Sequence, residues 1–370
     1  MHYSGKLKRS EIIQSLRDQY PANYFIVLQF GDCNIKVNAN QNEITEALTE
    51  YFDGFITDER QFQLEITVHE AAPPAFSADF TIKTPDPGKT KIKEEYINLD
   101  QGRIVRKRLT EMQFIFGENE NLAIGPCLGN MNQVVNFINN RFIEWDLCKG
   151  SLLGHAAAVL WKEQGIAMAG FSGAGKSTLA LHLMSKGTDF ISNDRLMINV
   201  ENNELVMRGV AKLPRINPGT ILNNEDLIGI LSESEKEEFE ALPPDKLWQL
   251  EHKFDVPVGE CFSNSRFLLK APMKMLVLLN WQRSEGKTEI KQVNLRERRD
   301  LLPAFMKSTG LFFLPHTASH INDATEDDYL EMLQHCDVIE VSGAIDFSQA
   351  AEACLTFIET GSLGSHVAAN

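Results

Sequence analysis

The first third of the chain mixes two patterns of hydrophobic and polar positions. Apolar residues recur at helical spacing in some segments and alternate with polar residues, or form short apolar runs, in others. The predicted helices are residues 11–20 and 42–52, and the predicted strands lie within residues 24–39, 62–71 and 102–117. The first strand segment is interrupted by Gly31-Asp32, which favours a hairpin with a short turn. We therefore expect an N-terminal α+β domain over residues 1–127.

From residue 128 the pattern changes to longer helices that alternate with short, strongly apolar strands. The predicted helices are residues 131–150, 176–186, 295–308 and 346–360, and the predicted strands are residues 155–161, 165–170, 188–200 and 273–281. Gly187 is suited to end the second of these helices in a left-handed conformation. Such alternation is typical of an α/β core built around a packed sheet. It predicts a second domain over residues 128–370.

Composition and charge narrow the classes of partner. The chain of 370 residues is 43% hydrophobic and 24% charged, as in ordinary globular proteins, and its formal net charge is −15. A surface of this sign repels nucleic-acid backbones, so we expect no nucleic-acid partner, and any phosphate ligand must be held by a local site.

Cysteine usage and hydropathy exclude further classes. The six cysteines lie far apart with no Cys-x-x-Cys pair, which disfavours a zinc site or a disulfide framework. The first residues lack the apolar core of a signal peptide, and the longest apolar run, "MLVLL" from Met275, is far too short to span a membrane. We expect no membrane partner and a cytoplasmic protein.

One segment carries a strong chemical signal. Gly170, four residues, then Gly175-Lys176-Ser177 match the P-loop pattern between a predicted strand and a predicted helix. Glycines let backbone N–H groups converge on phosphate oxygens, and the start of the helix adds its positive dipole. We expect the lysine to reach the outer phosphates of a nucleotide and the serine to bind Mg2+. The predicted nucleotide-binding residues are Gly170, Phe171, Ser172, Gly173, Ala174, Gly175, Lys176, Ser177 and Thr178.

The usual companions of this loop are missing. An ordinary P-loop ATPase carries a second apolar strand that ends in Asp, whereas the best such strand here ends in Asn280. The Asn-Lys-x-Asp guanine reader of GTPases is also absent from the sequence. The chain therefore belongs to a less common branch of phosphate-loop proteins.

Two polar positions lie at suggestive distances from the loop. His155 precedes it on the neighbouring predicted strand, and Asn193-Asp194 follow one helix and one strand later. A strand, loop, helix and strand unit returns the chain beside its start, so the tip of "FISND" should lie next to the loop. Asp194 could then bind Mg2+, or accept the proton of an attacking hydroxyl.

At this point the residues resemble a family. The segment "GHAAAVLWKEQGIAMAGFSGAGKSTLALHLMSKGTDFISNDRLMI" is similar to the catalytic core of the bacterial HPr kinase/phosphorylases. More distant segments, among them "KLPRINPGT", "LWQLEHKFDV", "RFLLKAPM" and "EVSGAIDFSQA", resemble the HPr kinase-related kinases, B type. The likeness spans roughly residues 128–358, and the N-terminal part resembles the related kinases only weakly.

The resemblance implies a P-loop kinase core of the HPr kinase and phosphoenolpyruvate carboxykinase type. It implies ATP and Mg2+, transfer of the γ-phosphate to a protein serine hydroxyl, and a homo-oligomer. Residue by residue, it implies that Lys176 is a catalytic lysine and that His155 assists the base. Asp194 matches the second Asp of the family's pair.

Departures from the family pattern leave alternatives open. The first Asp of the pair is Asn193 here, which cannot take a proton at neutral pH, and Val206 stands at the family's metal-binding Glu. Glu204, on the same face of the predicted strand, is a possible replacement. The family's later arginine has no clear counterpart. The candidates for clamping phosphate are Arg215, Lys253 and Arg266, of which we favour Arg266 as catalytic.

Three functions remain open at this stage. The first is an ATP-dependent kinase that acts on a protein serine, the second is a kinase for a small-molecule hydroxyl, and the third is a nucleotide-binding regulator without phosphate transfer. His316 and His320 are spaced to share a metal if helical, although the nearby proline makes a loop the better interpretation.

Overall fold

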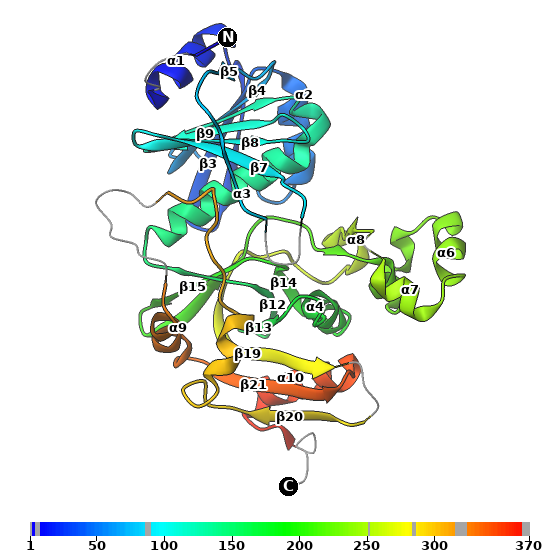
Figure 1. Ribbon diagram of the computed structural model, residues 1–370. Coiled ribbons are helices and arrows are strands. Elements are labelled where there is room, and N and C mark those ends of the chain that lie inside the picture. The colour runs from blue at the N-terminus through cyan, green and yellow to red at the C-terminus, as the bar shows by residue number, and fades with distance from the viewer. Residues whose placement is uncertain are drawn as a thin grey trace. The chain divides into compact units, whose positions relative to one another are not determined.

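The computed structural model describes residues 2–3, 8–85, 90–250, 252–282, 286–314 and 324–364. The chain divides into two compact units, each with its own sheet (Figure 1). Unit 1 holds residues 1–149 and 309–321, and unit 2 holds residues 150–308 and 322–370. The protein is thus a mixed α/β chain in which the first unit is completed by a segment from late in the sequence.

Unit 1 is built on an eight-stranded sheet in the order β2-β3-β4-β10-β9-β8-β7-β6. Its strands are β2 (Tyr24–Phe30), β3 (Cys33–Ala39), β4 (Leu64–Glu70), β6 (Thr81–Ile82), β7 (Glu94–Leu99), β8 (Gly102–Lys107), β9 (Gln113–Gly117) and β10 (Glu120–Gly125). The short strands β1 (His2–Tyr3) and β5 (Ala75–Phe76) form a separate parallel pair. The predicted hairpin is present, because Gly31 takes the positive φ of 63° that its turn requires.

Helices cover the unit 1 sheet and exclude water from its apolar side chains. Helix α1 (Arg9–Gln19) inserts Ile12, Ile13 and Leu16 among isoleucines and leucines of β7, β8, β9 and β10. Helices α2 (Asn42–Tyr51) and α3 (Met131–Leu147) pack against each other, and a 3-10 turn, η1 (Leu128–Asn130), precedes α3. Phe137 of α3 contacts the rings of Phe114 and Phe116 on β9.

Unit 2 contains a nine-stranded sheet whose main path is β11-β15-β16-β19-β13-β12-β14, with β21 and β20 continuing from β19. The strands are β11 (Leu152–Gly154), β12 (Ala156–Trp161), β13 (Gln164–Gly170), β14 (Asp189–Ser192), β15 (Leu196–Glu201), β16 (Glu204–Arg208), β19 (Lys270–Gln282), β20 (Thr288–Gln292) and β21 (Asp337–Ala344). The central strands β13, β19 and β21 are parallel, and the middle of each strand is buried.

Two apolar clusters lie on the two faces of this sheet. One contains α4 (Lys176–Met184) and α10 (Phe347–Thr360), and the other contains the 3-10 turn η3 (Arg299–Ala304) and α9 (Glu326–Leu333). Strand β12 alternates between them, with Ala157 and Val159 in the first cluster and Ala158 and Leu160 in the second. The remaining elements follow β16: β17 (Arg215–Ile216), α5 (Pro218–Leu222), η2 (Glu225–Ile230), α6 (Glu233–Glu240), α7 (Pro244–Gln249), β18 (Phe254–Asp255) and α8 (Val258–Cys261).

The structure differs from the sequence-based expectation in several places. The predicted strand 188–200 is divided into β14 and β15. The boundary between the compact units follows Lys149 rather than residue 127, because α3 packs on β4 and β10 of unit 1. The predicted helix 295–308 is reduced to the 3-10 turn η3, which contains Pro303. The predicted strand 102–117 is split into the antiparallel strands β8 and β9.

No helix in the described ranges is long and apolar enough to cross a membrane.

Candidate functional site

The strand register of unit 2 brings three chain segments to one edge of the sheet. Strand β13 ends at Gly170, and its neighbour β12 begins at Ala156, which pairs with Ala169. On the other side of β12, Ala158 pairs with Ser192, the last residue of β14. Because β14 is antiparallel to β12, it is parallel to β13, and both strands point their carboxyl ends to this edge. His155, the loop after Gly170 and Asn193-Asp194 therefore lie together, with β12 between β13 and β14.

Glycines shape the loop between β13 and α4. Gly175 caps the helix with a φ of 87°, and a Cβ atom there would lie 2.6 Å from the ring of Phe347. At Gly170 a Cβ atom would lie 2.8 Å from the Cβ of Ala174 and 3.0 Å from the carbonyl oxygen of Leu279. The loop is also fixed from outside, since Trp281 donates its indole N–H to the carbonyl of Ala174 at 2.8 Å. The backbone is thus held in an open turn at the start of α4.

The remaining loop residues are available to a ligand. Phe171, Ser172 and Gly173 are exposed, and Phe171 shows 55% of its surface to solvent. Ser177 is partly buried on the first turn of α4. Thr178 is buried and its hydroxyl lies 3.1 Å from that of Thr220 on α5, so it anchors the helix to its neighbour.

Lys176 lies across the mouth of the loop. Its ammonium donates a hydrogen bond to the carbonyl oxygen of Gly170 at 2.8 Å. Burial lowers the pKa of this lysine, the negative charge of Asp194 opposes that shift, and the positive charge of Lys307 adds to it. A partly desolvated ammonium whose hydrogen bond goes to a neutral carbonyl is poised to move onto an anion placed in the loop.

Asp194 is the centre of the charged group at this edge. His155 Nε2 lies 3.1 Å from Asp194 Oδ1, Lys307 Nζ lies 3.8 Å from the same oxygen, and Arg195 Nε lies 3.8 Å from Oδ2. Desolvation raises the pKa of Asp194, but the hydrogen bond from His155 and the charges of Lys307 and Arg195 outweigh it. The pKa is therefore held well below its usual range, and Asp194 is ionised at neutral pH. Its side chain is 55% exposed, so a ligand can still reach it.

The donor set at this edge fits Mg2+. The side-chain oxygen of Asn193 is buried and has no hydrogen-bond partner among the described residues. Asp194, the next residue in the chain, carries an ionised carboxylate, and Ser177 carries a hydroxyl on the first turn of α4. Mg2+ prefers such oxygen ligands and keeps several positions for water and substrate phosphates. Within the described ranges no cluster of three or more His, Cys, Asp or Glu side chains could hold a metal.

Arg266 is not part of this group, contrary to the sequence-based prediction. It is bound to Asp189 at 2.6 Å, and Asp189 pairs with Leu160, which in turn pairs with Gly165. Gly165 and Gly170 are separated by about 16 Å along β13, because a strand rises roughly 3.3 Å per residue. Arg266 thus lies at the opposite end of the sheet, where it closes an ion pair.

The remaining candidates either lie elsewhere or are not described. Glu204 pairs with Glu201 at the far end of the β15–β16 hairpin from Asp194 and forms an ion pair with Lys274, so it does not replace the missing metal ligand. Arg215 is 3.0 Å from Asp255 and donates to the carbonyl of Lys253, which makes it a link between β17 and β18. His316 and His320 lie outside the described residues.

Sequence reasoning missed the cations around Asp194. Lys307 follows η3, and Lys212 lies in the segment after β16, where burial lowers its pKa and the charge of Asp194 opposes the shift. The sequence signal was weak, because Arg195 and Lys212 stand among other charged residues and Lys307 comes far later in the chain. Only the fold shows that several cations share one carboxylate.

No family model matches the chain, and no curated protein matches it. Solved structures do match it. One is a structure of the Hpr(Ser) kinase/phosphatase from Coxiella burnetii, with 12% sequence identity and a TM-score of 0.29; the match covers 56% of this chain and 95% of that chain. At this TM-score the match carries no functional argument, so a functional assignment has to rest on the side chains of the site.

Proposed function

We propose that this chain is an ATP-dependent kinase that transfers the γ-phosphate of ATP to a hydroxyl group, with a protein serine as the favoured acceptor. The observation that carries the proposal is the 3.1 Å contact between His155 Nε2 and Asp194 Oδ1. This contact lies at the sheet edge where β13 ends and the glycine loop begins. A phosphate cradle and an ionised carboxylate on one edge are the two parts that phosphoryl transfer needs.

The loop and its cations supply the binding part. Backbone N–H groups from Phe171 to Gly175 and the start of α4 would surround the β- and γ-phosphates. Lys176 would leave the carbonyl of Gly170 for a phosphate oxygen, and Lys307 and Arg195 add positive charge near the transferred group. When bound, Mg2+ would neutralise charge on the same phosphates, with Ser177 and Asp194 as its protein ligands.

Asp194 would act on the acceptor. The acceptor oxygen forms a bond to the γ-phosphorus, the bond between that phosphorus and the β-phosphate oxygen breaks, and ADP leaves. The hydroxyl proton passes to Asp194, which His155 orients through its hydrogen bond. Because the pKa of Asp194 is depressed, its main contribution is to hold and orient the hydroxyl, and positioning with charge neutralisation accounts for most of the rate.

A second candidate is a nucleotide-binding regulator that transfers no phosphate. It is favoured by the same surroundings of Asp194, because a carboxylate stabilised by His155, Lys307 and Arg195 is a weak base. Asn193 beside it cannot serve in its place. This candidate predicts ATP binding with negligible turnover.

One labelling experiment separates the candidates. The purified chain and its Lys176→Ala variant are incubated with γ-labelled ATP and Mg2+, with and without a lysate of the source organism. Lysine-dependent label on a protein band that yields phosphoserine supports the proposal, and label on a small solute assigns a metabolite kinase instead. ATP binding without transfer to any acceptor contradicts the kinase assignment and leaves the regulator.

A further inference from the structure

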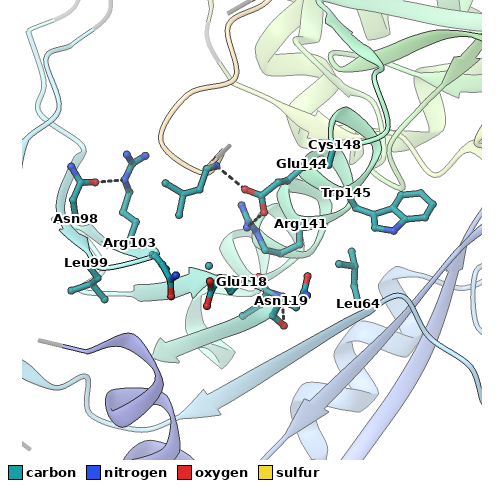
Figure 2. Close-up of a pocket in the computed structure, with 15 residues that line it drawn as sticks. Leu64, Asn98, Leu99, Arg103, Glu118, Asn119, Arg141, Glu144, Trp145 and Cys148 are labelled. Carbon is teal, nitrogen blue, oxygen red and sulfur yellow. Dashed lines mark hydrogen bonds and ion pairs between the residues drawn. The ribbon is translucent and has the colours of Figure 1, made fainter. Parts of the chain in front are cut away.

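Unit 1 contains a pocket that the kinase proposal does not use. It has a volume of about 400 Å³ and lies between α3 and the turns that join β7 to β8 and β9 to β10 (Figure 2). Arg141 and Asn121 are buried at its base, and Asn98 and Asn119 are exposed at its rim. A cavity of this size is in the range that holds a small metabolite.

The two carboxylates that line the pocket are already neutralised. Glu118 is paired with Arg9 of α1 at 3.0 Å, and Glu144 forms an ion pair with Arg141 one turn earlier on α3. Glu144 also accepts the backbone N–H of Leu314 at 2.7 Å. Neither side chain therefore calls for a cation from a ligand.

Arg103 is the one charged lining residue, in the described part of the chain, without an ion-pair partner. No described carboxylate lies within 4.0 Å of its guanidinium, which donates only to neutral oxygens: the side chain of Asn98 at 2.9 Å and the carbonyl of Leu311 at 2.7 Å. The side chain is half-buried and rests on the ring of Tyr96. Burial lowers the pKa of Arg103, while Tyr96 and Glu144 offset part of the shift. The guanidinium of Arg103 can therefore pair with an anionic ligand.

Apolar side chains form another part of the wall. Figure 2 shows Trp145 and Leu64 on the opposite side of the pocket from Arg103 and Leu99, with Arg141 between them. Leu314 completes the lining from the late segment of unit 1. A ligand that fits has an anionic head for the guanidinium and an apolar body for the indole and the leucines.

We propose that this pocket binds a small organic monocarboxylate, whose carboxylate pairs with Arg103 and whose apolar body lies against Trp145 and Leu64. A single guanidinium without a described carboxylate partner matches a monoanion. A phosphate dianion would leave a net negative charge beside Glu118 and Glu144, in a partly desolvated site where such charge is costly. The planar carboxylate also matches the planar fork of a guanidinium.

Cys148 gives a direct readout, because it lines the pocket and is only partly buried. The experiment uses the full chain with Cys261 and Cys336, the other two partly buried cysteines in the described ranges, replaced by serine. The rate of alkylation of Cys148 by N-ethylmaleimide is measured with millimolar phenylacetate, phenylphosphate, 2-phenylethylamine or 2-phenylethanol. Phenylacetate should slow the reaction several-fold and the amine should not. Equal effects of phenylacetate, the amine and the alcohol, or stronger protection by phenylphosphate, would overturn the proposal.

Substitutions of Arg103 test whether its guanidinium binds the carboxylate of the ligand. Arg103→Gln should weaken protection by phenylacetate about tenfold or more, because it removes a charge-assisted hydrogen bond. Arg106→Gln is the matched control: this arginine lies on the same strand but pairs with Glu95 and does not line the pocket, so protection should persist. Arg103→Lys keeps the positive charge, so its protection by phenylacetate should lie between that of Arg103→Gln and that of Arg106→Gln. This variant keeps the proposal testable if Arg103→Gln folds poorly. Unchanged protection in both Arg103 variants would contradict the assignment.

Discussion

The two sites for which we propose anionic ligands, one in each unit, pair their carboxylates and cations in different ways. At the sheet edge of unit 2, one carboxylate, Asp194, is shared by Lys307, Arg195 and His155, with Lys176 close by. In the pocket of unit 1, Glu144 pairs with Arg141 and Glu118 shares Arg9 with Glu120. Arg103 lines the pocket without a described carboxylate partner. The two proposed sites therefore differ in the ligand that we expect, which is a polyphosphate at the sheet edge of unit 2 and a monoanion in the pocket of unit 1.

The largest effect on the proposed site of unit 2 should come from removing the ammonium of Lys176. Lys176→Ala should reduce phosphate transfer by at least about a hundredfold, because a preorganised charge aimed at the transferring group is lost. Lys186→Ala, in the turn that follows α4, is the matched control and should transfer phosphate normally, since Lys186 only pairs with Glu352 at 3.8 Å. Transfer is followed with γ-labelled ATP, and circular dichroism checks the fold. Equal rates in the two variants would refute the role of the loop.

Unit 1 should respond to acid because it buries a neutral histidine. His69 on β4 is fully buried, its ring nitrogens have no hydrogen-bond partner among the described residues, and burial lowers its pKa to about 4 from 6.5. Between these values the unfolded chain binds a proton that the folded chain does not. Stability should therefore fall as the pH drops through this window, by about 3 kcal/mol at full extent.

Urea unfolding followed by tryptophan fluorescence at neutral pH and at about pH 4.5 measures this loss. His69→Leu should remove most of the pH dependence, whereas His335→Leu, at an exposed position in unit 2, should keep it. A wild-type midpoint that does not move with pH would contradict the prediction.

A third test concerns the shape of the phosphate loop. Gly175→Ala should destabilise unit 2 by about 1–3 kcal/mol, because alanine is strained at a φ of 87° and its Cβ would collide with Phe347. Combining Gly175→Ala with Phe347→Leu should restore the part of the stability that is lost to the collision with the Phe347 ring. Gly173→Ala separates the two causes, since Gly173 has a φ of 83° but nothing within 4 Å of an added Cβ. The measurement is the urea midpoint of unfolding with and without ATP. If Gly175→Ala leaves this midpoint unchanged, the loop relaxes without cost and the prediction is wrong.

The smallest expected effect comes from a single member of the cation group. Lys307→Met should lower turnover about tenfold, because Lys176 and Arg195 still neutralise the transferred phosphate. Lys274→Met, which only breaks the pair with Glu204 at the far end of the β15–β16 hairpin, should leave turnover unchanged. Steady-state ATP consumption measures both. A rise in turnover for Lys307→Met would indicate that this lysine restrains Asp194 rather than the phosphate.

Local signals predicted much of the fold but not the arrangement of the site. Strand β13, its glycine loop and α4 are visible in the sequence, because glycines, capping and helical spacing act over a few residues. The insertion of β12 between β13 and β14 depends on which strands pair, which no short window of sequence contains. His155 and Asp194 could be proposed from their spacing around the loop, but their hydrogen bond depends on that pairing.

The incorrect prediction for Arg266 and the contacts that the sequence did not reveal also depend on which segments meet in the fold. Arg266 looked suitable because it stands in a polar loop before an apolar strand, yet such loops occur at both ends of a sheet, and pairing with Asp189 fixes it at the wrong end. Lys307 was overlooked because it reaches Asp194 from a segment that is remote in sequence. The pocket of unit 1 was invisible for the same reason, since Leu314 and Arg103 meet only in the folded chain.

The late segment of unit 1 has a practical consequence. Phe312 stacks on Phe116 with ring centres 5.6 Å apart and meets Phe114 edge-on at 5.4 Å. A fragment that ends at Lys149 would lack this ring and would expose the apolar surface that the ring covers. We therefore expect the fragment to aggregate when it is produced alone. Supplying residues 309–314 as a separate peptide should restore its solubility, much as a split protein regains its fold when both pieces are mixed.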